Sequence, residues 1–342
     1  MINRLQKTVI TLTLASVFTA LPALVSSPIS AIAYAEEGTK ATKKRSSKKV
    51  PAMRNRVYAQ LARAQKLADE GDKIGGFEVL DEVKERLDQL NSYEQAMLYN
   101  FYGFMYYGNE DLANAIDSFE KVIAQEAIPD SLYLSTTYSL AQLAMQQQDY
   151  KKALAFLNQW QAFNTKDLTA NQHVVFAQVH YQDKNFQDTL KHVNQAIELA
   201  KVDGDIAKEQ WLILQRAAYY ELKQPEQVTK VLEQLVKYYE KPSYWLQLAG
   251  MYGEIGLENK QLGAMETAWQ AGYITKETDI VMLAQLYMFN QLPYKAAALL
   301  DDAISKGLVV ADEKRLELMS QAYMLAKEDE KAIPVLIKAA EI

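Results

Sequence analysis

One short pattern recurs along this chain at a nearly constant step. Its clearest copies pair a small residue with an apolar residue four positions later, as in Ala115-x₃-Phe119, Ala153-x₃-Leu157 and Ala296-x₃-Leu300. Equivalent positions are residues 76, 115, 153, 189, 228, 261, 296 and 332, which are 39, 38, 36, 39, 33, 35 and 36 residues apart. Chance amphipathicity would not keep this step over eight units, so we predict an array of similar structural repeats.

A second pattern precedes most of these positions and indicates the type of repeat. It is clearest at Trp245-x₂-Leu248-Ala249-x₂-Tyr252 and returns at Ile280-x₂-Leu283-Ala284-x₂-Tyr287. The two patterns together are typical of the tetratricopeptide repeat, a pair of helices of about 34 residues. Pro and Gly fall mainly between helical runs, and no segment alternates convincingly as a strand would. The predicted fold is therefore all-α: a tetratricopeptide-type α-solenoid, a right-handed superhelix of about eight antiparallel helix pairs over residues 54–342.

The residue types fit this packing. Small residues such as Gly103 and Ala249 would let the two helices of a pair approach closely, and aromatic residues such as Tyr252 would fill the gap to the adjoining helix. Each pair leaves an apolar face open that only the next pair can cover. We therefore expect a bulky residue at Ala249 to destabilise the array locally.

The N-terminal region reads as an export signal followed by a linker. Residues 1–35 combine a basic start, an apolar stretch broken by Pro22 and the A-x-A site Ala33-Tyr34-Ala35, as in a cleavable signal peptide. An uncleaved membrane anchor is the alternative. Residues 36–53 are rich in basic residues and poor in apolar ones, so they are predicted to be a disordered basic linker. It would be either a solvated tether or a segment that adheres to an anionic envelope surface or to the acidic body of the chain itself. The mature protein is therefore expected outside the cytoplasm.

Charge and cysteine content narrow the class of partner. From Val57 onward the chain has 27 basic and 41 acidic residues, a net charge of −14, which argues against nucleic acid as a partner. Cysteine is absent, so disulfides, thiolate zinc sites and lipidation at an N-terminal Cys are excluded.

The sequence shows few signs of catalytic chemistry. No G-x-S-x-G, H-E-x-x-H, Walker A or G-x-G-x-x-G pattern occurs, so we expect neither an enzyme nor a bound cofactor. His173 and His180 lie seven residues apart on one helix face and could suggest a metal pair. They occupy repeat positions where large aromatic residues pack, which favours core histidines and no metal. His192 belongs to a second helix and shows no clear carboxylate partner.

The repeat also predicts a protein-binding surface. First helices of such a solenoid line its concave face, and the accessible positions lie between the packing residues. Glutamine amides can pair with a peptide backbone, and Met and Tyr offer adaptable apolar contacts. A merely solvated inner wall is the alternative. The predicted concave-face residues are Phe104, Tyr107, Gln142, Met145, Gln178, Tyr181, Tyr220, Gln285, Met288, Gln321 and Met324.

The later half of the chain resembles a known family over about residues 210–325. The runs that carry the resemblance are Tyr244-Trp245-Leu246-Gln247-Leu248, Gln270-Ala271-Gly272-Tyr273-Ile274, Met282-Leu283-Ala284-Gln285-Leu286-Tyr287, Pro293-Tyr294-Lys295-Ala296-Ala297, Lys306-Gly307-Leu308 and Asp312-Glu313-Lys314. In this order they are similar to periplasmic tetratricopeptide proteins associated with TonB energy-transduction systems of Gram-negative bacteria. The resemblance implies an accessory of the TonB–ExbB–ExbD complex, with TonB, ExbB, ExbD or an outer-membrane receptor as partner.

Two readings of function stay open from the sequence. One is a periplasmic scaffold of a TonB-type transport system, and the other is a general envelope assembly factor or chaperone-like adaptor. The apolar terminal helix, residues 333–342, adds the possibility of self-association.

Overall fold

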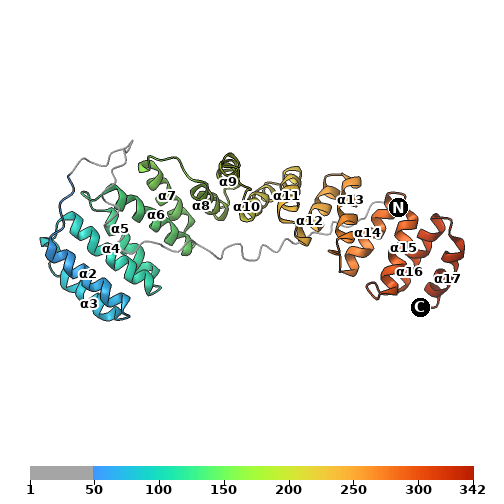
Figure 1. The fold of residues 1–342 in the computed structure, drawn as a ribbon, viewed down its shortest axis with the longest axis horizontal. Helices are drawn as coiled ribbons and strands as arrows, with labels where there is room; N and C mark the ends of the chain where they lie inside the picture. The colour runs from blue at the N-terminus through green and yellow to red at the C-terminus, as the bar shows by residue number, and fades with distance from the viewer. Residues whose placement is uncertain (1–48) are drawn as a thin grey trace. The chain divides into compact units, whose positions relative to one another are not determined.

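The computed structural model describes residues 49–342, and within them the fold is entirely helical (Figure 1). The predicted signal peptide and residues 36–48 of the predicted linker lie outside this range. Sixteen α-helices span the described residues, and no strand occurs among them, so the predicted all-α solenoid fold is confirmed. The helices are α2 (Asn55–Asp69), α3 (Lys73–Lys84), α4 (Ser92–Gly108), α5 (Leu112–Ile123), α6 (Asp130–Gln146), α7 (Tyr150–Phe163), α8 (Ala170–Gln182), α9 (Phe186–Val202), α10 (Glu209–Glu221), α11 (Pro225–Tyr239), α12 (Pro242–Glu254), α13 (Glu258–Gln270), α14 (Glu277–Phe289), α15 (Pro293–Ser305), α16 (Glu313–Leu325) and α17 (Asp329–Ala340), with a 3-10 turn η2 (Leu87–Gln89) after α3.

The chain divides within α9 into two compact units, which end and begin at His192 and Val193. In unit 1 the pairs are α2 with α3, α4 with α5 and α6 with α7, and each second helix also packs on the first helix of the next pair. Unit 2 repeats this scheme from α10 to α17. Each pair thus supplies the apolar cover that its neighbour lacks, which is the serial packing of a solenoid.

A left-handed backbone residue ends the first helix of every pair. Its positive φ occurs at Gly71, Glu110, Gln148, Lys184, Lys223, Gly256, Gln291 and Lys327, each five residues before the repeat position identified in the sequence. One residue further on, a backbone N–H donates to a carbonyl in the last turn of that helix, as from Leu292 to Tyr287, at 2.8–3.0 Å in all eight pairs. This is the Schellman closure of a helix C-terminus, and it fixes the turn into the second helix.

The second helices begin differently in the two units. In unit 1, Asp72, Asp111 and Asp149 accept a hydrogen bond from a backbone N–H of the first turn, and Asn185 does the same ahead of α9. In unit 2 no side chain caps α11, α13, α15 or α17, and Pro225 and Pro293 stand at the start of α11 and α15. Proline at the first helical position pre-sets the helical φ, and the N–H that it lacks would have no partner within the helix.

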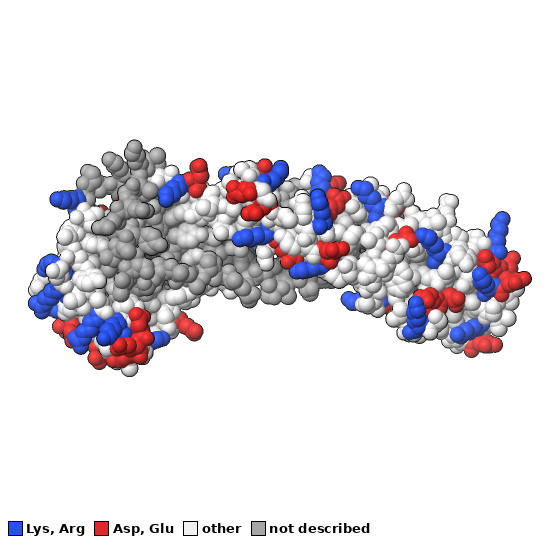
Figure 2. All heavy atoms as spheres, viewed as in Figure 1, with Lys and Arg blue, Asp and Glu red and all other residues white. Residues whose placement is uncertain are grey.

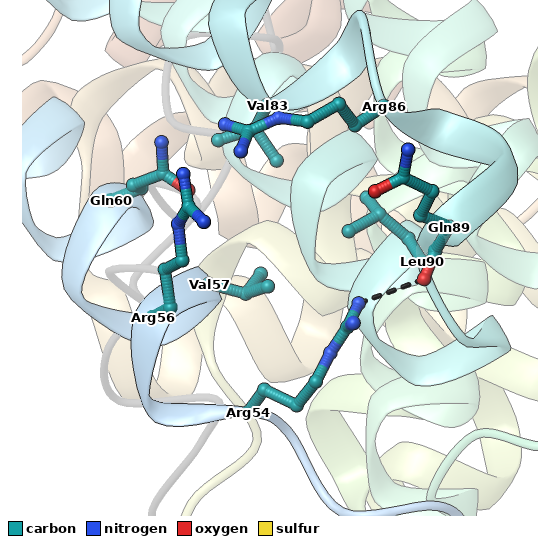
Figure 3. Close-up of a pocket in the computed structure, with 8 residues that line it drawn as sticks. All are labelled: Arg54, Arg56, Val57, Gln60, Val83, Arg86, Gln89 and Leu90. Carbon is teal, nitrogen blue, oxygen red and sulfur yellow. Dashed lines mark hydrogen bonds between the residues drawn. The ribbon is translucent and has the colours of Figure 1, made fainter.

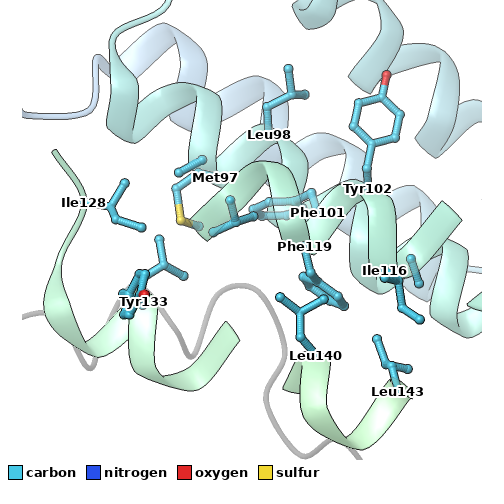
Figure 4. Packing of buried hydrophobic residues seen from close by; sticks show 14 of the residues in the cluster. Met97, Leu98, Phe101, Tyr102, Ile116, Phe119, Ile128, Tyr133, Leu140 and Leu143 are labelled. Atoms are coloured by element: carbon cyan, nitrogen blue, oxygen red, sulfur yellow. The ribbon is translucent and has the colours of Figure 1, made fainter. Parts of the chain in front are cut away.

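Small residues bring the helices of a pair together, as predicted. Ala141, Ala177, Ala249 and Ala284 are at most 1% exposed. A Cβ built on Gly103 would lie 2.6 Å from the ring of Phe119, so only glycine fits between α4 and α5 at this contact. Figure 4 shows the resulting core of unit 1, where side chains of α4, α5 and α6 meet around Phe119.

The fifth pair breaks the small-residue rule. The small residue of each pair lies twelve residues before the repeat position and is Gly, Ala or Ser in the other pairs. In the fifth pair this position, twelve residues before Val228, is Arg216 of α10, which is only 7% exposed. Its Nη1 donates to Oε1 of Gln247 on α12. The substitution explains why the first-helix pattern is hard to find in this part of the sequence.

A recurring polar contact links consecutive pairs. The hydroxyl of Tyr252 on α12 donates to Glu233 of α11 at 2.7 Å, while Lys260 of α13 lies over the Tyr252 ring. In the next pair Lys295 lies over Tyr287 and forms a 2.7 Å ion pair with Glu266. Three helices from two repeats therefore meet at each such tyrosine.

Candidate protein-binding face

The predicted binding residues of unit 2 are accessible. Gln285 on α14 and Gln321 on α16 are exposed, Met288 is half-buried, and Tyr220 and Met324 are 44% and 45% exposed. Equivalent positions of successive first helices fall on the same side of a regular solenoid. These side chains therefore belong to one surface, which we call the first-helix face of unit 2. Whether a partner binds there stays a prediction.

The predicted residues of unit 1 are less open. Phe104 packs edge-on against Phe119 with ring centroids 5.3 Å apart, and Tyr181 packs in the same way on Phe186 at 5.5 Å. Gln142 is 6% exposed, so its amide is largely covered within unit 1. Tyr107, Met145 and Gln178 are half-buried. The predicted binding residues of unit 2 therefore leave more surface exposed for a partner than those of unit 1 do.

Sequence reasoning missed the most exposed apolar side chains of this face. Phe289 on α14 and Leu325 on α16 are 60% and 67% exposed, and each directly follows a predicted methionine. Met282 is seven residues before Phe289 and shares its side of α14, because seven residues make almost two turns. The signal was present in the sequence: apolar residues stand at the same place in two consecutive repeats.

The same position carries a carboxylate in the earlier repeats of unit 2. Glu221 of α10 and Glu254 of α12 are exposed at the equivalents of Phe289 and Leu325. The first-helix face of unit 2 thus changes from acidic at α10 and α12 to apolar at α14 and α16. In the view of Figure 2, acidic and basic side chains are interspersed on the surface.

The three histidines of the chain lie together in unit 1. Nδ1 of His173 on α8 and Nδ1 of His192 on α9 are 3.0 Å apart, and the His192 ring stacks on both Phe176 and His180. The sequence predicts His173 and His180 on one helix face and shows no clear carboxylate partner for His192. The structure shows that its partner is another histidine.

Burial sets the protonation of this cluster. Loss of solvent lowers the pKa of His173 and of His180, and burial together with the two neighbouring histidines lowers the pKa of His192 to about 4. The stacked, half-buried rings suit packing in the neutral form. Within residues 49–342, no group of three or more His, Asp or Glu residues has the geometry of a metal site. The expectation that the protein has no metal and no catalytic residues stays a prediction.

No helix among the described residues combines the length and the apolar character needed to cross a bilayer.

Comparison with known proteins gives structural neighbours only. No family model and no curated protein matches the sequence. A tetratricopeptide repeat protein from Parabacteroides merdae aligns over 78% of this chain and 98% of its own, with 14% identity and a TM-score of 0.43. The apo form of RapI aligns over 83% and 86%, with 13% identity and a TM-score of 0.46, and MamA aligns over 52% and 91%, with 15% identity and a TM-score of 0.42. The chain is similar to these proteins, and its own helix pairs and their spacing define it as a tetratricopeptide-type solenoid.

Proposed function

We propose that this protein is a periplasmic protein-binding scaffold that serves a TonB–ExbB–ExbD outer-membrane transport system. The observation that carries the binding role is the set of apolar and amide side chains exposed at equivalent places of α14 and α16, above all Phe289 and Leu325. Large apolar side chains grouped on a surface favour contact with another protein.

The chemistry of the face favours a polypeptide partner. Gln285 and Gln321 can each donate to and accept from a peptide backbone. Met288 and Met324 adapt to differently shaped apolar side chains. Exposed Glu221 and Glu254 would favour a basic residue beside the apolar part of the bound segment, since opposite charges attract across an interface.

Export and the TonB association rest on the sequence. The signal-peptide pattern of residues 1–35 supports a periplasmic location, and the runs between residues 244 and 314 support the link to TonB systems by resemblance. The partner would be TonB, ExbB, ExbD or an outer-membrane receptor.

Affinity capture from cross-linked envelope extracts tests this proposal. We expect the wild-type protein to recover a TonB-system component, and the double variant Phe289→Ser, Leu325→Ser to lose it. Tyr238→Ser is the matched control, because Tyr238 is a 42% exposed aromatic residue on the second helix α11 of the same unit. This control should recover the component as the wild type does.

Two outcomes would contradict the proposal. Equal recovery by wild type and double variant would remove the first-helix face from the interaction. Recovery of many unrelated unfolded proteins without any TonB-system component would replace the transport role by the general chaperone-like role.

A further inference from the structure

A pocket of about 110 Å³ lies in the first helix pair of unit 1, on α2, the end of α3 and the turn η2 (Figure 3). Its charged lining residues are all arginines: Arg54, Arg56 and Arg86. The remaining lining residues are neutral: Val57, Gln60, Val83, Gln89 and Leu90. Three cations without a lining carboxylate are unusual in a chain whose net charge from Val57 onward is −14.

One of these arginines already has its anion. Arg54 donates from Nε and Nη2 to the carboxylate of Glu94, at 2.8 and 2.6 Å, and its backbone N–H donates to the same group. Glu94 itself is fully buried. Nη2 of Arg54 also donates to the carbonyl of Gln89 at 2.8 Å. Arg54 therefore fixes the pocket wall and is not available to a ligand.

The other two guanidinium groups remain for a ligand. Arg56 is exposed on the first turn of α2, and Arg86 is half-buried between α3 and η2. Figure 3 shows their side chains extending over the same opening from these two elements. Nη2 of Arg86 is 3.5 Å from the carbonyl oxygen of Glu82, at the limit of a hydrogen bond. Glu82, Glu85 and Asp88 are close in sequence, but none of the three lines the pocket.

The start of α2 adds to the positive potential. Its own residues supply no side-chain cap and no acidic first turn, while the buried Glu94 carboxylate already accepts the backbone N–H of the N-cap residue Arg54. The unpaired N–H groups of a helix start carry partial positive charge and favour an anion. Arg56 and Val57, which line the pocket, belong to this first turn.

From this geometry we propose that the pocket binds a phosphate-type oxyanion, held by Arg56 and Arg86. Two guanidinium groups can each form paired hydrogen bonds to phosphate oxygens. Gln60 can donate a further hydrogen bond, and Val57, Val83 and Leu90 provide an apolar floor for a carbon group attached to the phosphate. The phosphate can belong to a small soluble molecule or to a lipid headgroup.

Calorimetric titration of the purified protein with inorganic phosphate and with phenyl phosphate tests the site. We expect saturable binding of both, tighter for phenyl phosphate because its ring covers the apolar floor. Arg56→Gln and Arg86→Gln should each weaken binding about tenfold, the usual effect of losing a hydrogen bond to a charged group. Arg63→Gln, which removes an exposed α2 arginine that does not line the pocket, should leave binding unchanged.

Vesicles distinguish the two sources of phosphate. Binding to phosphatidylcholine vesicles containing phosphatidic acid, weakened by Arg86→Gln and by free phosphate, would identify a lipid headgroup. Phosphate binding without vesicle binding would identify a soluble ligand. The proposal is overturned if wild type binds neither probe, or if Arg63→Gln weakens binding as much as Arg56→Gln and Arg86→Gln do. Thermal melting of each variant shows whether lost binding reflects lost folding.

Discussion

The left-handed turn residues are the most regular backbone feature at the residue scale. Six of the eight carry a side chain, as Glu110, Lys223 and Gln291 do, although L-residues adopt this conformation at a cost of about 1–2 kcal/mol. The Schellman hydrogen bond and the packing of the two helices hold them there. At Gly71 and Gly256 that strain is absent, because glycine has no Cβ.

Two glycines of unit 2 allow a matched test of this strain. No atom lies within 4 Å of a Cβ built on Gly256 or on Gly263, so alanine would meet no steric obstacle at either site. Gly256 has a φ of +73°, whereas Gly263 lies inside α13. We expect Gly256→Ala to lower the free energy of unfolding by about 1–2 kcal/mol. Gly263→Ala should raise it by about 1 kcal/mol, the helix propensity difference. Urea denaturation followed by tryptophan fluorescence measures both, and a change of the same sign in both variants would contradict the turn assignment.

The histidine cluster predicts a loss of stability in acid. The pKa of His192 falls to about 4 in the folded protein, below its ordinary value of 6.5, so the unfolded chain binds more protons between these values. The stabilising effect of neutral His192 is complete above pH 6.5 and is lost as the pH falls towards 4. Acidic Asp188 is close enough to His192 to oppose this shift in part.

His192→Phe tests this prediction. The Phe ring can keep the stack on Phe176, while the group that titrates is gone. We expect wild type and variant to have similar melting temperatures at pH 7. Between pH 6.5 and 4 the melting temperature of the variant should fall less than that of the wild type. Identical pH dependence in the two proteins would show that His192 is not the responsible group.

At the scale of helices, the two units start their second helices by different means. Asp149 caps α7 by accepting from the N–H of Lys152 at 3.0 Å, whereas Gln224 precedes α11 without a side-chain cap. Asp149→Ala should therefore cost about 1 kcal/mol of folding free energy. Gln224→Ala should be near neutral. Denaturant titration decides, and an equal cost for both would argue against the cap.

The close contact of α4 and α5 gives a second prediction at this scale. Gly103→Ala would press a methyl group against the ring of Phe119, which is 1% exposed and has little room to move. Overpacking of this kind costs about 1–3 kcal/mol. Gly108→Ala, at the end of the same helix with nothing within 4 Å, is the control and should not destabilise. A stable Gly103→Ala variant would show that the two helices can separate at no cost.

Much of the helical framework could be predicted from the sequence. The repeat positions follow a steady step, and Tyr150, Phe186 and Pro293 begin second helices three residues before the repeat positions 153, 189 and 296. Left-handed Lys184 and Lys223 could not be predicted, because lysine shows no preference for that conformation and only the tertiary packing imposes it. Tyr294, an aromatic residue in the first turn of α15, is 52% exposed, so an aromatic residue beside a turn does not by itself indicate burial.

The candidate face was predicted only in part, for a related reason. Period and position place Gln285 and Met324 on the first-helix face, but they do not tell how far neighbouring helices cover it. Gln142 is covered, whereas Phe289 is open. The exposure of a side chain depends on side chains from several helices that are far apart in the sequence, so the repeat pattern alone does not predict it.

At the scale of the whole molecule, the polarity of one surface position changes from repeat to repeat along the first helices of unit 2. Acidic Glu221 and Glu254 occupy the place that Phe289 and Leu325 take later in unit 2. The overall acidity of the chain after Val57 favours a partner with basic residues, and the apolar part of the face favours one with apolar side chains. Both properties can belong to one polypeptide segment.

The most direct measurement is site-specific photo-cross-linking in intact cells. A photoreactive residue replaces Phe289 on the first-helix face of unit 2 or, as a control, Tyr238 on α11. The account predicts a discrete cross-linked product with a TonB-system protein from position 289 and none from position 238. Equal products from both positions, or none from position 289 while the protein is folded and exported, would contradict it.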